Sequence, residues 1–179
     1  MFRTPLFVRA RLALACVLAP ALLTASCDSV DLATAIEIGE IESGYYDAGV
    51  TDMGLNKLVP SITLRLKNIS EAPVTSVDMV LYFRSQATEV HPESELDEII
   101  VTAIGSDGLA PAAMTEPLVV RSKQGYTLEQ ARAELFVHRD FRDVTVRMFL
   151  KRAGKLVPIG DHQIERRLLL ATPTDPAAR

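Results

Sequence analysis

Two stretches near the middle of the chain alternate between apolar and polar positions. Residues 61–67, SITLRLK, carry a large apolar side chain at every second position, and residues 76–84, SVDMVLYFR, repeat this period of two. Successive side chains on a strand point to opposite faces, so each stretch predicts a strand with one buried face. Turn-forming residues fill the intervening segment 68–73, NISEAP. The two strands are therefore expected to form an antiparallel pair.

The same alternation recurs in the last third of the chain. Residues 144–150 follow it, and KRAGK at 151–155 supplies a glycine-containing turn into residues 156–170. This arrangement predicts a C-terminal hairpin. Two further strands are predicted over residues 96–105 and 116–122, with a glycine-containing turn between them.

The first strand of the domain has a break in its alternation. Ile36 and Ile38 share one parity, whereas Ile41 and Tyr45 have the other, and Gly39 lies at the slip. One extra residue in one strand of a pair produces such a slip, so we predict a β-bulge and a bent strand here.

Residues 126–141, YTLEQARAELFVHRDF, depart from the strand pattern. Thr127 and Gln130 have the spacing of a capping box, and apolar residues up to Leu135 follow at helical spacing. A short helix that closes one end of the fold is therefore predicted. Short strands with turn signals and one short helix favour an all-β fold, a two-layer antiparallel immunoglobulin-like β-sandwich.

Two motifs within this pattern resemble a known family. Residues 61–85 contain the order strand, K-N-x-S, turn and strand ending in an aromatic residue, which resembles FxLYD-type bacterial extracytoplasmic sandwich domains. Residues 108–120, GLAPAAMTEPLVV, are similar to the L-x-P-G turn of that family, with Ala112 in place of the glycine. The resemblance implies a sandwich fold and brings no catalytic residue with it.

The first 26 residues have the composition of a secretory signal peptide. They contain three arginines and no acidic residue, followed by an apolar run of 14 residues that ends in small side chains. A transmembrane helix needs about 20 apolar residues, so the run predicts a cleaved signal rather than a permanent anchor. The domain limits expected are 1–26 for the signal, 34–171 for the sandwich and 172–179 for a disordered tail.

Cys27 follows this signal directly. Leu23, Thr24, Ala25 and Ser26 precede it, and the segment resembles the bacterial lipoprotein lipobox. The resemblance implies lipidation of Cys27 by a diacylglycerol and an N-acyl chain, which makes residues 27–33 a lipidated tether. Two or more acyl chains hold a protein firmly on a membrane, whereas one chain binds only marginally.

The sequence leaves open which membrane holds the protein and where the signal peptide is cut. Asp28 resembles the residue that retains lipoproteins in the inner membrane of enteric bacteria, but both the inner and the outer membrane remain candidates. The alternative to lipidation is an ordinary signal peptide cut near residues 19–21, which would leave Cys27 as a thiol.

Charge and cysteine content restrict the partners and the source of stability. The formal net charge of −4 becomes −7 once the three signal arginines are removed, which argues against nucleic acid or anionic lipid held by general electrostatics. Cys16 leaves with the signal, so a domain acylated at Cys27 has no disulfide. Its stability must come from a hydrophobic core, for which its length suffices.

No reactive side chains in the sequence form a known catalytic or metal-binding motif. His138 to Asp140 read HRD, but the asparagine of a kinase catalytic loop and a glycine-rich phosphate loop are absent. His91, His138 and His162 lack zinc-site spacings and are expected to be solvated. The acidic run 93–98 is expected to be a solvated loop. We therefore expect no enzyme activity, metal or cofactor.

Tyr45 and Tyr46 are the candidate interaction residues. They stand side by side before a glycine-containing loop, and neighbours on a strand face opposite ways, so one is expected in the core and the other at the surface. Exposed tyrosines are enriched in protein interfaces.

These observations favour a non-catalytic envelope lipoprotein. It would be exported, anchored through lipid on Cys27 to the inner or outer membrane, face the periplasm, engage another envelope protein and bind no nucleic acid. The alternative is a carrier of a lipid or small hydrophobic ligand; a hydrolase is a third class and would need convergent titratable groups. A filled core supports the interaction module, and an apolar cavity on the order of several hundred Å³ supports the carrier.

Overall fold

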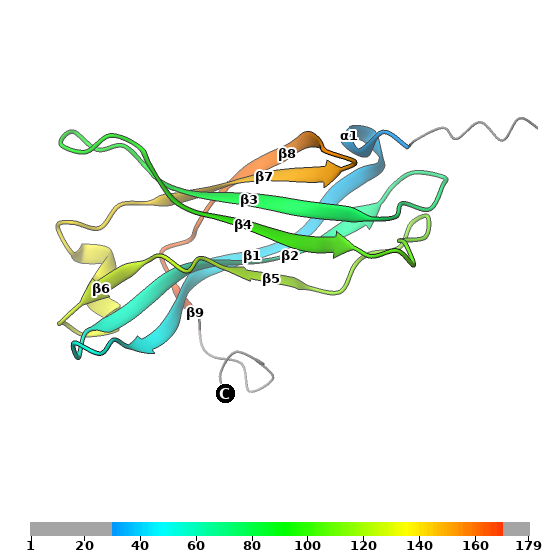
Figure 1. The fold of residues 1–179 in the computed structure, drawn as a ribbon. Helices are drawn as coiled ribbons and strands as arrows, with labels where there is room; N and C mark the ends of the chain where they lie inside the picture. Colours follow the sequence, from blue (N-terminus) through cyan, green and yellow to red (C-terminus); the bar gives the residue numbers. More distant parts are fainter. Residues whose placement is uncertain (1–29, 170–179) are drawn as a thin grey trace, which may run out of the picture.

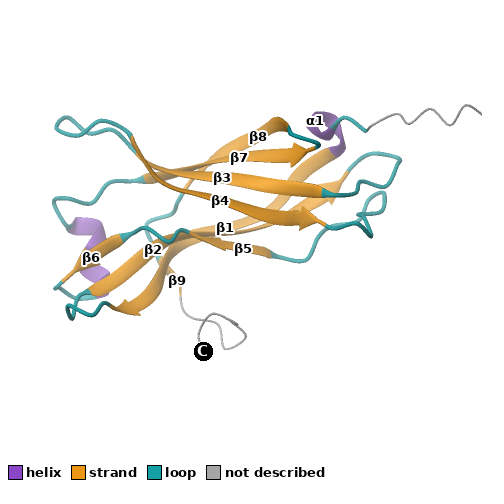
Figure 2. Ribbon diagram, viewed as in Figure 1, coloured by secondary structure: helices purple, strands orange, loops and turns teal. Residues whose placement is uncertain are grey.

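The structure, a computed structural model, describes residues 30–169. Two β-sheets pack face to face (Figure 1), and strands make up most of the described chain (Figure 2). The elements in chain order are α1 (Leu32–Ala35), β1 (Ile36–Val50), β2 (Asn56–Asn68), β3 (Val77–Ser85), β4 (Ser94–Ile104), β5 (Leu118–Arg121), β6 (Tyr126–Leu128), η1 (Arg132–Val137), β7 (Val144–Arg152), β8 (Lys155–Gln163) and β9 (Leu168–Leu169).

The strands divide between the two sheets as in an immunoglobulin-like sandwich. One sheet has the order β5-β2-β1-β9, with β6 also paired to β2, and the other has the order β4-β3-β7-β8. The pairs are antiparallel except for β9, which lies in the other sheet from β8 and runs parallel to β1. The predicted all-β sandwich is confirmed.

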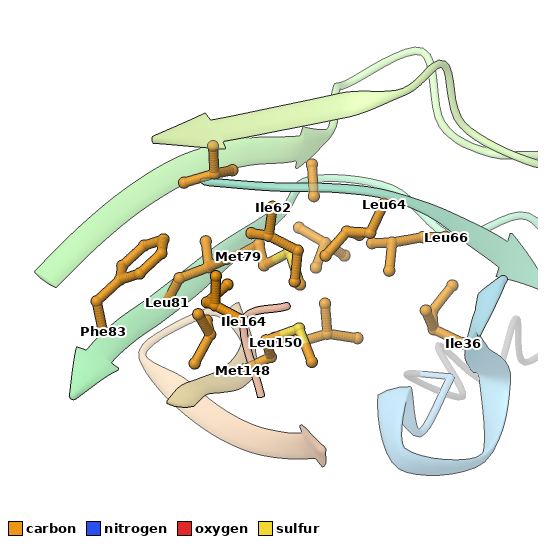
Figure 3. Close-up of a cluster of buried hydrophobic side chains, with 14 of the residues drawn as sticks. Ile36, Ile62, Leu64, Leu66, Met79, Leu81, Phe83, Met148, Leu150 and Ile164 are labelled. Carbon is orange, nitrogen blue, oxygen red and sulfur yellow. The ribbon is translucent and has the colours of Figure 1, made fainter. Parts of the chain in front are cut away.

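The alternating apolar residues that the sequence marked form the centre of the core. Figure 3 shows side chains from β2, β3 and β7 interdigitating between the sheets. Each is at most 1% exposed, and burying one such side chain contributes roughly 1.5–3 kcal/mol. They include Ile62, Leu64, Leu66, Met79, Leu81, Phe83, Met148 and Leu150.

The predicted pairing of residues 61–67 with residues 76–84 is wrong. β2 bonds with β1, β5 and β6, whereas β3 bonds with β4 and β7 in the other sheet. The intervening segment crosses between the layers and is held by Asn68, whose buried amide donates to the carbonyls of Ala72 and Leu109 at 2.9 and 2.8 Å. An alternating pattern specifies which face is buried and leaves the strand partner undetermined.

Two local predictions are confirmed. The β1–β2 register shifts between Ile38 and Ile41, which is the bulge expected beside Gly39. The β7–β8 hairpin also forms, with Ala153 and Gly154 at φ 49° and 80° in its two-residue turn. Positive φ at both turn positions matches the twist of the flanking strands.

The predicted capping box is wrong. Thr127 lies in β6, where it pairs with Lys57 of β2, so its backbone is extended. The helix begins later, as the 3-10 helix η1, and it contributes buried Leu135. It does lie at one end of the sandwich, as expected (Figure 1). The pairing of β6 with β2 therefore determines the conformation of Thr127, and the local capping motif does not.

A second short helix precedes the first strand. The Asp31 carboxylate accepts a hydrogen bond from the Ala33 N–H at 3.3 Å and caps α1. Leu32 and Ala35 are 4% and 1% exposed, so the packed domain includes residues before position 34. No helix within residues 30–169 has the length and apolarity to cross a membrane.

Candidate functional site

The two candidate tyrosines of β1 face opposite sides of their sheet. Tyr45 is fully buried, whereas Tyr46 is half-buried on the outer surface. A partner therefore has no access to Tyr45, and the candidate interaction surface reduces to Tyr46 and its neighbours.

Tyr45 belongs to an aromatic cluster that closes one end of the core. Its ring centroid lies 5.4 Å from that of Phe136, 5.6 Å from Phe141 and 6.1 Å from Tyr126. The Tyr45 hydroxyl is buried without a hydrogen-bond partner, and burial raises the pKa of Tyr45 well above its ordinary value. Such a neutral hydroxyl among rings is a packing element.

Tyr46 is covered by Arg121, the last residue of β5. The guanidinium carbon of Arg121 lies 3.8 Å from the Tyr46 ring centroid, which is a cation–π contact. The position of Arg121 follows from Pro60 on β2, whose carbonyl accepts from Ser122 N–H while its nitrogen has no proton to donate to the neighbouring strand. The neighbouring strand consequently breaks into β5 and β6, and Arg121 stands at the break.

An open hollow of about 360 Å³, here called the Tyr46 groove, lies beside this stack on the outer face. β9 forms one wall and β5 the other. β9 can approach so closely because Gly44 has no side chain: a Cβ there would lie 2.8 Å from the Arg167 carbonyl oxygen and 2.9 Å from Leu169 Cγ. The lining residues are Glu42, Tyr46, Ser61, Thr63, Val119, Arg121, Arg167, Leu168 and Leu169.

Arg167 holds the β9 wall in place. Its Nε donates to the Ser43 carbonyl at 2.7 Å, and its Nη2 lies 3.2 Å from Oε1 of Glu42. Glu165 adds a second carboxylate 3.0 Å from Nε. The arrangement blocks the edge of β1 and gives the groove charged groups of both signs.

A second open hollow, of about 540 Å³, shares Tyr46 and Arg121 with the groove. Lys57 and Lys123 also line it, and the ammonium of Lys57 donates to the Lys123 carbonyl at 3.0 Å. Asp47 lines the same hollow and pairs with Arg132 of η1 at 2.6 Å. The Tyr46–Arg121 stack thus stands at the boundary of two open depressions, each lined by both apolar and charged groups.

Among the described residues, the lining of the Tyr46 groove contains no histidine or cysteine, and its one carboxylate, Glu42, is paired with Arg167. Within residues 30–169, no cluster of three or more His, Cys, Asp or Glu residues could hold a metal. His91 and His138 are exposed, but His162 is half-buried and lies 3.0 Å from the Ser43 hydroxyl, so it is not a fully solvated histidine.

The acidic run 93–98 lies largely on β4, so its prediction as a loop is wrong, whereas Glu93, Glu95 and Glu98 are exposed to solvent as expected. Asp97 accepts from the Lys123 N–H at 2.7 Å, and Glu98 accepts from the Tyr82 hydroxyl at 3.1 Å. Glu93 forms a 3.0 Å ion pair with Arg84. These carboxylates therefore have structural partners.

Two groove residues, Arg121 and Arg167, were absent from the sequence-based candidates. No local motif marks them, because their role depends on how β5 and β9 meet β1 and β2. Cys27, the signal segment 1–26 and the tail 172–179 lie outside the described residues.

The fold defines an all-β sandwich protein. No family model matches the chain, and no curated protein matches it significantly. A solved structure titled as the X-ray structure of Northeast Structural Genomics Consortium target SoR45 is 13% identical, over 80% of this chain and 92% of that chain, with a TM-score of 0.42. At this level the similarity says nothing about function.

Proposed function

We propose that this chain is a membrane-anchored envelope lipoprotein whose sandwich acts as a non-catalytic protein-interaction module. Acylation of Cys27 would hold it on the periplasmic side of the inner or outer membrane. The observation that carries the interaction role is the Tyr46 groove, where a stacked aromatic and arginine stand between two open depressions. Tyrosine and arginine are the residue types most often enriched at binding hot spots.

The packed space between the sheets supports an interaction module over a carrier. Buried residues from both sheets form one continuous hydrophobic cluster there. The Tyr46 groove and its neighbouring hollow are open to solvent and lined by charged and polar groups as well as apolar ones. Pockets for small hydrophobic ligands instead enclose most of the ligand within apolar walls.

Site-specific photo-crosslinking of the native lipidated protein tests this function. A photoreactive residue replaces Val119 in the groove or, as the matched control, Ile100 on β4 of the other sheet; both positions are 52% exposed. We expect one stoichiometric envelope partner to crosslink from position 119 and not from position 100. Arg121→Ala should abolish that crosslink. Equal capture from both positions, or none from 119, contradicts the proposal.

Substitution of Cys27 tests the proposed lipid anchor. Cys27→Ser should release the protein from membranes and change its electrophoretic mobility, because the acyl chains are lost. Unchanged membrane association and mobility would contradict lipidation.

A further inference from the structure

The chain enters the sandwich beside its most concentrated group of basic residues. The β7–β8 hairpin carries Lys151, Arg152 and Lys155 within five residues. The guanidinium of Arg152 donates to the carbonyl of Val30, the first described residue, so the entry point is fastened to the hairpin. Figure 1 places α1 and the β7–β8 turn at the same end of the molecule, opposite η1.

The three cations of this turn, here called the basic turn, form no ion pair with an acidic residue in the described part of the chain, residues 30–169. Among residues 30–169, the ion pairs with Asp or Glu involve other arginines and His138, and none involves Lys151, Arg152 or Lys155. Arg152 and Lys155 are instead direct cross-strand neighbours. Like charges placed opposite each other destabilise a sheet, so this pairing has an energetic cost that no ion pair among residues 30–169 offsets.

Two acidic side chains beside the basic turn bond to other residues. Asp31 lines the same shallow hollow as Arg152 and Lys155, but its carboxylate caps α1 through the Ala33 N–H. Asp78 stands across the ladder from Lys151, and its carboxylate accepts from the Thr102 hydroxyl at 3.1 Å. Lys155 is exposed at the tip.

We propose that the basic turn contacts the headgroups of anionic phospholipids when the protein is anchored through Cys27, an inference that rests on the proposed lipidation. Cys27 is three residues before Val30, so a fully extended chain separates their Cα atoms by at most about 11 Å. Electrostatic attraction extends over about 8 Å at physiological ionic strength. A domain tethered this closely must bring the end that carries Val30 to the membrane surface.

Contact through the basic turn also fixes the orientation of the sandwich relative to the membrane. With the basic turn on the membrane, η1 and the β1–β2 turn point away from it (Figure 1). The net negative charge of the whole chain does not oppose this contact, because charges farther than a Debye length from the surface are screened.

Amine labelling of the acylated protein on vesicles tests the contact. The probe is Lys155, and the control is Lys123, an exposed lysine at the β5–β6 corner toward the other end of the sandwich. The protein is placed on vesicles of phosphatidylcholine alone or with about one third phosphatidylglycerol. We expect labelling of Lys155 to slow about fivefold on the anionic vesicles relative to the neutral ones, and labelling of Lys123 to stay unchanged.

High salt should abolish the difference, because the Debye length falls to about 3 Å at 1 M. Equal labelling of Lys155 on both vesicles, by a protein that stays vesicle-bound, overturns the inference and leaves the lipid anchor intact. Equal slowing at Lys155 and Lys123 overturns the proposed orientation. A wild-type protein that washes off the vesicles as readily as Cys27→Ser overturns the anchor, and this inference with it.

Discussion

Asn68 accepts two hydrogen bonds from Ser70, one from its backbone N–H at 2.9 Å and one from its hydroxyl at 2.7 Å. The fully buried Asn68 amide also reaches the carbonyls of Ala72 and Leu109. The K-N-x-S motif therefore ties the β2–β3 crossover to the loop that follows β4. Its polar groups are satisfied within the fold, which makes it a structural feature rather than a binding site.

Asn68→Ala should lower the free energy of unfolding by about 3 kcal/mol, because it removes four hydrogen bonds made by a fully buried side chain. The carbonyls of Leu109 and Ala72 keep a second donor each, the Val74 N–H and the Ser70 hydroxyl. Asn56→Ala is the control, since its amide bonds to the Gln130 carbonyl in an exposed position, and it should cost about 0.5 kcal/mol or less. Urea denaturation measures both values. Equal losses in the two variants would contradict a special role for Asn68.

Tyr45→Phe should leave stability unchanged or raise it by about 1 kcal/mol, because the buried hydroxyl has no hydrogen-bond partner. Tyr126→Phe provides the contrast, since its hydroxyl donates to the Arg142 carbonyl at 2.6 Å, and its loss should cost about 1 kcal/mol. Thermal unfolding of the two variants distinguishes them. A destabilised Tyr45→Phe would mean that this hydroxyl has a partner.

Stability should fall in alkaline solution. Burial raises the pKa values of Tyr45 and Tyr126 above the ordinary 10.0, so the folded protein retains these protons more tightly than the unfolded chain. The contribution is complete below pH 10 and is lost as the pH rises above it.

Denaturation at about pH 8 and about pH 11 measures this loss, which the Tyr45→Phe/Tyr126→Phe double variant should reduce. An equally steep fall in that variant would assign the effect to other groups.

Ala112→Gly should stabilise the protein by about 1 kcal/mol. Ala112 has φ 61°, a left-handed conformation that glycine adopts without steric cost. The neighbouring Ala110 has no positive φ, so Ala110→Gly is the control and should cost about 0.5 kcal/mol through chain entropy. Melting temperatures that move in the same direction for both variants would count against backbone strain at Ala112.

Gly44→Ala should disrupt the Tyr46 groove. The added Cβ would lie 2.8 Å from the Arg167 carbonyl oxygen, so β9 must shift, at a cost of about 2 kcal/mol. Gly105→Ala meets nothing within 4 Å and should be neutral. The partner crosslink from position 119 reports the functional effect: it should weaken in Gly44→Ala alone. An undiminished crosslink would show that β9 is not part of the binding surface.

The alternating residues of β2, β3 and β7 identified both the strands and their buried faces, and the slip beside Gly39 located the bulge. The turn at Ala153–Gly154 was equally predictable, because each of these features follows from side-chain parity or the φ preferences of a few neighbouring residues. The helix predicted over residues 126–141 was located less accurately, because Thr127 forms part of β6 and pairs with β2.

Local sequence thus determined which segments are strands and which side chains enter the core. Only the tertiary structure decided that β2 and β3 lie in different sheets, that Arg121 covers Tyr46 and that β9 packs against Gly44 to form one wall of the Tyr46 groove. The reason is that the alternation of buried and exposed side chains depends on the geometry of a single strand. Strand pairing and the shape of the groove depend instead on segments up to a hundred or more residues apart in the chain. These segments come into contact because the whole core is buried at once.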